Sequence, residues 1–146
     1  MDYYDILMGA IGNGDIQLVK ELFEKANTIQ ASQYDNIMAF AAEKGHIDIV
    51  RFMLKHGATD YMWSLENASY NGHIDIVRLM IEQGAKNFDW AMALAACVGH
   101  FSIVQLLIEK GANNYRLALS FINPSPLGHD IKILLETYQA GKNKLM

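Results

Sequence analysis

Apolar residues recur every three or four positions in three similar stretches of the chain, which is the spacing expected for one face of an α-helix. In the first stretch they are Ile47, Ile49, Val50, Met53 and Leu54. The matching stretches begin at residues 74 and 101. Each of the three stretches is followed by a glycine, at position 57, 84 or 111. A glycine in that place is typical of a left-handed helix C-cap. The pattern therefore predicts three helices whose apolar faces are wide enough to be buried on two sides.

A shorter helix is expected before each of these, over Trp63–Asn71 and Trp90–Val98 in the two clearest cases. Each ends on a glycine, Gly72 or Gly99, and only one or two residues separate it from the next helix. So short a connection requires the two helices to pack as an antiparallel hairpin. A single hairpin cannot bury its apolar faces alone, whereas a stack of hairpins can.

The hairpin is repeated about five times along the chain. Gly45, Gly72 and Gly99 recur at a constant 27-residue interval. In a weaker copy, Gly14 lies slightly more than 27 residues before Gly45. In a damaged copy, Gly128 lies slightly more than 27 residues after Gly99. The repeats are expected at about 2–32, 33–59, 60–86, 87–113 and 114–141 of a single domain, 1–146, with the first and last acting as caps. The predicted fold is an all-α solenoid.

An aromatic residue stands just before each predicted short helix. The dipeptides that contain it are Asp2-Tyr3, Gln33-Tyr34, Asp60-Tyr61, Asn87-Phe88 and Asn114-Tyr115. Four of the first members are Asp or Asn, which favour N-caps and turns. We call these five aromatic residues the ladder aromatics and expect each ring to have a structural role, covering the edge of the next hairpin. This register also predicts a fifth short helix over Leu117–Ile122, ended by Pro124 and Pro126.

The repeated phrase, read from Gly99-His100 to Gly111-Ala112, resembles the ankyrin repeat, as do the Ala41-Ala42 and Ala95-Ala96 pairs. The family's Thr-Pro-Leu-His segment is replaced, for example by the four residues 63–66, and the 27-residue unit compares with about 33 in the family. The missing length falls where the family has a projecting β-hairpin finger. The resemblance implies an ankyrin-like αα-hairpin solenoid with these fingers shortened or absent, and a protein–protein interaction function. Such abbreviated repeats are similar to those encoded by large DNA viruses.

Composition narrows the class of protein further. Hydrophobic residues make up 51% and charged residues 19% of the chain, which favours a globular protein over a disordered one. The net charge of −4 is spread along the sequence and argues against nucleic acid as a partner. No apolar run approaches the roughly 20 residues needed to span a bilayer. The single cysteine favours a reducing compartment, and the start of the sequence has no basic segment of the kind found in signal peptides. We therefore expect the protein in the cytoplasm, or in the host cytoplasm if it is viral.

Candidate chemistry is sparse. His46, His73, His100 and His129 recur with the repeat and invite a metal interpretation. Stacked helices lie about 8–10 Å apart, so one histidine per repeat forms a row rather than a cluster of ligands. We expect each histidine to fill the turn between two helices and to bond nearby backbone. Cys97 lacks the orienting groups that activate a cysteine nucleophile. Together with the spacing of the histidines, this predicts no enzymatic activity, metal site or cofactor.

A helical wheel identifies the face of the short helices that points away from their buried side. At about 100° per residue, the positions five, two and one before the terminal glycine lie there. They are Phe40, Glu43, Lys44, Asn67, Tyr70, Asn71, Leu94, Cys97, Val98 and Phe121. Small alanines on the buried side let the short helices sit close together, so this face is expected to be concave. Its apolar members either form a partner site or pack laterally against the neighbouring short helix, and the sequence leaves both interpretations open.

The residue after each ladder aromatic differs between repeats, which makes Met62, Asp89 and Arg116 candidates for specificity. Arg116 offers a bidentate contact to a carboxylate. The leading hypothesis is a monomeric adaptor or inhibitor that binds a partner protein on its concave face. The alternative is a self-assembling repeat protein, in which a truncated cap at 124–128 leaves Phe121 uncovered and drives homo-oligomerisation through the terminal repeats.

Overall fold

The computed structural model describes residues 3–25 and 29–144, and within them every regular element is a helix and there is no β-strand. The elements are α1 (Tyr3–Gly12), α2 (Ile16–Lys25), η1 (Ala31–Gln33), α3 (Tyr34–Lys44), α4 (Ile47–His56), α5 (Tyr61–Asn71), α6 (Ile74–Glu82), α7 (Phe88–Val98), α8 (Phe101–Glu109), α9 (Tyr115–Phe121) and α10 (Pro126–Lys144). The predicted all-α solenoid is confirmed, and turns replace the β-hairpin fingers over the described residues.

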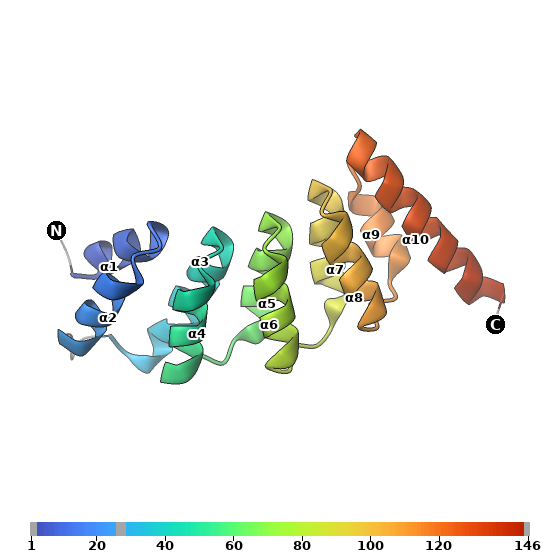
Figure 1. Ribbon diagram of the computed structural model, residues 1–146. Coiled ribbons are helices and arrows are strands. Elements are labelled where there is room, and N and C mark those ends of the chain that lie inside the picture. Colours follow the sequence, from blue (N-terminus) through green and yellow to red (C-terminus); the bar gives the residue numbers. More distant parts are fainter. Residues whose placement is uncertain (1–2, 26–28, 145–146) are drawn as a thin grey trace.

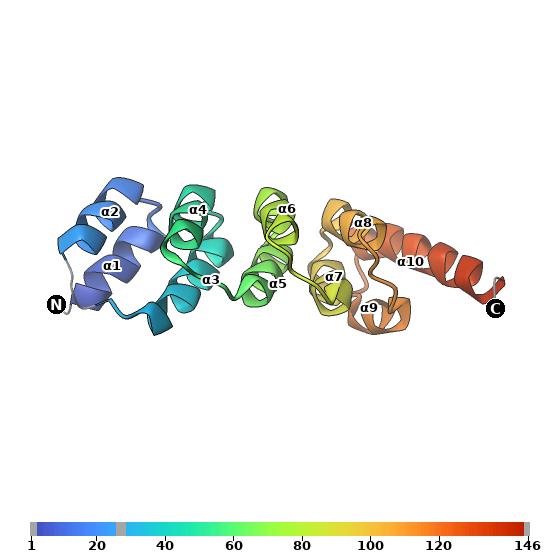
Figure 2. The same ribbon diagram turned by 90° about the horizontal axis from the view of Figure 1, so that it is seen from below.

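The helices stack as successive antiparallel hairpins in two layers (Figures 1 and 2). Figure 2 shows α1, α3, α5, α7 and α9 in one layer, with α2, α4, α6 and α8 in the other. The first helices of neighbouring hairpins contact each other extensively, whereas the second helices meet at few positions. A stack with this difference curves toward its first helices, so the first-helix layer is the inner side.

Small residues allow the first helices to approach closely. Ala41, Ala42, Ala68, Ser69, Ala95 and Ala96 are all buried at the contacts of this layer. Larger side chains fill the space between the layers, and Val50, Met53, Val77, Met80, Val104 and Leu107 are buried on the second helices. The periodicity of the sequence therefore reflects one continuous core, to which every hairpin contributes the same two kinds of side chain.

The first helices begin two residues earlier than the sequence pattern indicates. Tyr61 is the first residue of α5, and Tyr115 is the first residue of α9, which ends at Phe121. The Asp60 side chain caps α5 by accepting a hydrogen bond from the Trp63 backbone N–H. The Asn114 side chain caps α9 in the same way. Asn87 is instead left-handed and makes no such bond, while Asp2 lies outside the described residues.

Histidines link consecutive hairpins. The Nε2 atoms of three repeat histidines lie close to a carbonyl oxygen of the preceding first helix: His46 to Gly12 (3.1 Å), His73 to Glu43 (2.9 Å) and His100 to Tyr70 (3.0 Å). Bonding to nearby backbone was expected, and the structure shows that the bond reaches into the previous repeat. Each histidine thereby hydrogen-bonds a carbonyl at the C-terminal end of a helix. Such a carbonyl has no backbone N–H partner within its own helix.

The last hairpin departs from the predicted register. His129 is exposed within α10 and does not take the place of the other repeat histidines. Leu127 takes that place, since its Cβ lies 3.0 Å from the position of a Cβ built on Gly99. The Cys97 carbonyl is satisfied by the side-chain amide of Asn123, 2.9 Å away. The regular register therefore continues through Leu127, and the match at Gly128-His129 was wrong.

Candidate partner-binding site

An apolar face on the first-helix layer spans α5 and α7. We define it by its four most exposed side chains: Trp63 (45% exposed), Tyr70 (48%), Trp90 (41%) and Val98 (43%). Trp63 and Tyr70 are seven residues apart on α5, so both point to the same side of that helix. Since α5 and α7 pack side by side, the four exposed side chains lie on adjoining helices of the first-helix layer.

Only some of the apolar residues expected on this face are exposed. Tyr70 and Val98 are, whereas Phe40, Leu94 and Phe121 are half-buried. The Phe40 ring lies over Gly12, 3.8 Å from the position a Cβ there would take. This contact fits the lateral-packing interpretation at Phe40.

Phe121 packs against the neighbouring repeat rather than remaining uncovered. Its ring meets Trp90 edge to face, with ring centroids 5.3 Å apart and an interplanar angle of 85°. Edge-to-face contact is a favoured geometry for aromatic pairs. The idea that the end of the stack leaves Phe121 open for assembly is therefore wrong.

Trp63 and Trp90 are the members of the apolar face that the sequence analysis missed. They occupy equivalent positions in consecutive repeats, nine residues before Gly72 and Gly99. That position is one helical turn before Asn67 and Leu94, which were assigned to the open face. Extending the wheel by one turn toward the N-terminus would have found both tryptophans.

The polar residues expected on this face are mostly engaged with the protein itself. Lys44 pairs with Glu43, with Nζ 2.8 Å from Oε1, and its ammonium lies 5.2 Å from the centroid of the Phe40 ring. The Asn67 side-chain amide donates to the Trp63 carbonyl, and that of Asn71 donates to the Asn67 carbonyl. The two amide oxygens are acceptors at the surface, and the paired charges at the end of α3 neutralise each other.

Asp89 has a structural role that the sequence did not indicate. Its Oδ1 accepts hydrogen bonds from the backbone N–H groups of Asn113 (2.7 Å) and Asn114 (2.9 Å) in the next turn. Asp35 makes the same pair of bonds two repeats earlier, to Thr59 and Asp60. This carboxylate fixes a turn between hairpins, which leaves it poorly suited to the specificity role predicted from its variability.

The other two turn candidates differ from Asp89. Met62 is half-buried, and its Sδ lies 3.2 Å from the Lys86 backbone nitrogen, so it occupies the place of the turn-fixing carboxylate. Arg116 is exposed beside Asp89 at the start of α9. Among the described residues its guanidinium forms no ion pair, and it is the turn candidate best placed to meet a partner.

The ladder aromatics have the structural role expected of them. Tyr3, Tyr34, Tyr61, Phe88 and Tyr115 are all half-buried and pack against the core. The Tyr3 hydroxyl also donates to the Leu22 carbonyl across the first hairpin. These rings seal the edges of the hairpins and leave no large exposed surface.

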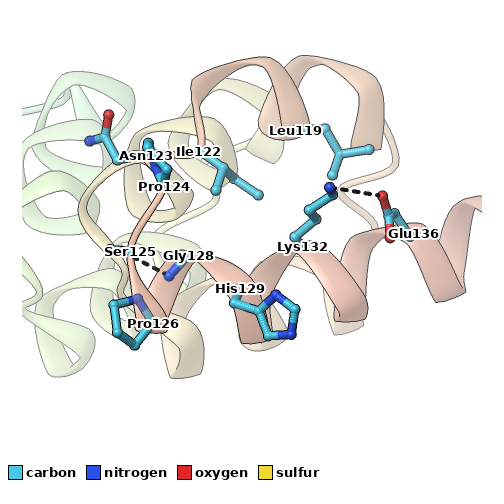
Figure 3. A pocket seen from close by; sticks show the side chains of 10 residues that line it. All are labelled: Leu119, Ile122, Asn123, Pro124, Ser125, Pro126, Gly128, His129, Lys132 and Glu136. Atoms are coloured by element: carbon cyan, nitrogen blue, oxygen red, sulfur yellow. Dashed lines mark hydrogen bonds and ion pairs between the residues drawn. The ribbon is translucent and has the colours of Figure 1, made fainter.

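A pocket lies away from the apolar face, between α9 and the start of α10 (Figure 3). It has a volume of about 710 Å³, and its lining includes Leu119, Ile122, Pro124, His129, Lys132 and Glu136. Lys132 and Glu136 pair with each other at 3.8 Å, and the Ser125 hydroxyl accepts from the Gly128 N–H. The polar groups that define it are thus used to start and support α10.

No group of three His, Cys, Asp or Glu side chains in residues 3–25 and 29–144 is arranged to hold a metal ion. None of the helices described is both long enough and apolar enough to cross a membrane.

Stacked helical hairpins with an exposed apolar face on their inner layer define a helical-repeat solenoid, a class that binds partners along an extended surface. A family model described as "Ankyrin repeats (3 copies)" matches residues 7–89, and one described as "Ankyrin repeat" matches residues 87–117. The chain belongs to the ankyrin-repeat family, whose repeats are generally protein–protein interaction modules without enzymatic activity. A comparison with curated proteins gave no match.

Proposed function

We propose that this chain binds a partner protein through the inner, first-helix layer and acts as an adaptor or inhibitor without catalysis of its own. The observation that carries the proposal is the exposure of Trp63, Tyr70, Trp90 and Val98 on adjoining helices. Large aromatic side chains at the centre of an interface contribute much of its binding energy. Exposed apolar patches rimmed by polar residues commonly mark interaction sites on soluble proteins.

The arrangement of polar groups supports the same proposal. Asn67 and Asn71 present amide oxygens beside the aromatic rings, and the Glu43–Lys44 pair stands at one end of the surface. An apolar centre with a polar rim is the usual composition of a protein interface. Arg116 stands beyond the other end as a charged contact for a partner carboxylate.

The test compares partner capture by three purified forms of the chain. The first is the wild type, the second is Trp63→Ser/Trp90→Ser, and the control is Phe101→Ser/Ile133→Ser. The control removes two exposed apolar side chains from α8 and α10, outside the apolar face. We expect mass spectrometry to identify partners held by the wild type and the control but lost by the tryptophan variant. Equal capture by all three forms, at unchanged helical circular dichroism, would exclude this surface.

A second candidate function is self-assembly through the terminal repeat. Leu127, Ile133 and Tyr138 are exposed along α10, and this is the observation in its favour. Sedimentation equilibrium distinguishes the two functions, since a monomer at micromolar concentration excludes assembly. A dimer that dissociates in the Leu127→Ser/Ile133→Ser variant would instead establish it.

We also propose a cellular location for the protein. The single Cys97 suits a reducing compartment and supports a location in the cytoplasm, or in the host cytoplasm if the abbreviated repeats derive from a large DNA virus. A fluorescent fusion in the source cell or infected host would test this location.

A further inference from the structure

We infer that the apolar face binds a proline-rich segment in the polyproline II conformation that carries a basic residue next to its prolines. The inference rests on the proposed function and names the kind of partner that the same surface fits. It starts from Trp63 and Trp90, which occupy the same place in consecutive repeats on helices packed side by side. Three further properties of the surface point to this ligand.

The first property is spacing. Packed helices lie about 8–10 Å apart, and equivalent side chains on neighbouring repeats are separated by a similar interval. Polyproline II has three residues per turn and a rise of about 3.1 Å per residue, so prolines three apart recur every ~9 Å. An extended β-strand repeats its side-chain direction at about 6.7 Å or about 13 Å, and neither value fits the interval. Prolines at i and i+3 therefore match the expected interval between equivalent positions on α5 and α7.

The second property is hydrogen bonding. An indole Nε1–H is a donor only, and within the described part of the chain neither Trp63 nor Trp90 has an acceptor for it. Polyproline II makes no internal hydrogen bonds, so its carbonyl oxygens are free to accept. A helical ligand with contacts at i and i+7 spans a comparable ~10.5 Å, but its carbonyls are already bonded within the helix. The free donors thus favour polyproline II over a helix.

The third property is charge. Next to Trp63 the surface carries the carboxylates of Glu66 on α5 and Asp60 at its N-cap. Burial, followed by repulsion from Asp60, raises the pKa of Glu66. No Lys or Arg pairs with either carboxylate among the residues described, and the Asp60 carboxylate accepts the Trp63 backbone N–H as a helix cap. A cationic residue flanking the prolines would relieve this repulsion.

The two tryptophans are the only ones in the sequence, so spectroscopy of tryptophan reports on this surface alone. The probe is a blocked peptide of Arg followed by nine prolines, titrated into uniformly ¹⁵N-labelled protein. We expect both indole N–H cross-peaks to shift and saturate together. A matched peptide of Arg followed by nine alanines is the control and is expected to cause no saturable shift.

Two protein variants separate the parts of the inference. Trp90→Phe keeps an aromatic ring but removes the N–H donor, and it should weaken peptide binding by about 3- to 10-fold, as expected for loss of one hydrogen bond. Glu66→Gln should reduce the preference for a peptide that begins with Arg over one that begins with Glu. Phe101→Ser, outside the apolar face, should leave the affinity unchanged.

Several results would overturn the inference. They are unshifted indole signals at millimolar peptide, equal binding of the alanine peptide, or binding that Trp90→Phe leaves intact. If cell partners are captured through Trp63 and Trp90 while the proline peptide does not bind, this inference fails and the proposed function stands. If both the capture and the peptide experiment are negative, both fail.

Discussion

The Nε2 atom of His100 lies 3.0 Å from the carbonyl oxygen of Tyr70. A turn of one repeat is therefore bonded to the C-terminal end of α5 in the repeat before it, and α5 is the helix that displays the exposed Tyr70 ring. The scaffold histidines and the candidate site are therefore connected. Replacing His100 by Ala leaves this carbonyl without its partner and should lower the free energy of unfolding by about 1–3 kcal/mol. Urea unfolding followed by circular dichroism measures the change.

His129→Ala is the matched control, because that side chain is exposed and makes no hydrogen bond within the described structure. It should change the free energy of unfolding by less than about 0.5 kcal/mol. Equal effects of the two substitutions would contradict the role assigned to the inter-repeat bond.

Asp89 is expected to act on stability. Asp89→Ala removes the acceptor for two backbone N–H groups of the following turn and should cost about 1–3 kcal/mol. Arg116→Ala, in the same place one repeat later, should have little effect on thermal unfolding. A stable Asp89→Ala protein that had lost its partner would instead support the specificity role inferred from sequence variability.

Alanine substitutions at Gly72 and Gly84 distinguish the effect of backbone strain from the effect of steric crowding. Both have positive φ, at 82° and 101°, so alanine is strained at either position by about 1–2 kcal/mol. A Cβ on Gly72 would lie 2.6 Å from the His100 ring, whereas one on Gly84 meets nothing within 4 Å. Gly72→Ala should therefore be the more destabilising in urea, by at least about 1 kcal/mol, because the ring must leave the Tyr70 carbonyl. The reverse order would argue against the close approach of His100.

Glu66 gives a pH dependence of stability whose sign follows from its environment. Burial and the Asp60 carboxylate raise the pKa of Glu66 in the folded state above its ordinary value of 4.5. Between that value and the folded pKa the folded state binds more protons than the unfolded state, so stability falls as pH rises through this window. Glu66→Gln removes the cost and should raise the melting temperature at pH 7.

The advantage of Glu66→Gln should shrink as the pH falls below the ordinary pKa of the carboxyl, where the wild-type side chain is protonated in both states. Glu82→Gln changes the net charge equally at an exposed position on α6 and serves as the control. A pH-independent difference between wild type and Glu66→Gln would show that the amide acts through packing.

The sequence by itself determined the architecture of this protein. Three copies of one phrase at a 27-residue spacing, each with its glycine stop, specify a helical hairpin that can be buried only by stacking on others. The small residues at 41–42, 68–69 and 95–96 indicated which side of the first helices is buried, and the structure buries all of them. These features are local or strictly periodic, so neighbouring residues along the chain are sufficient to predict them.

Only the tertiary structure decided which residues of the open face are exposed. A helical wheel gives the direction of a side chain from its own helix and does not include the neighbouring helix that covers it. Phe121 is covered by Trp90, whereas Tyr70 and Val98 have no such neighbour and are exposed. In the same way, Leu127 takes the place of a repeat histidine through contact with Gly99, a packing relationship that the match at Gly128-His129 concealed.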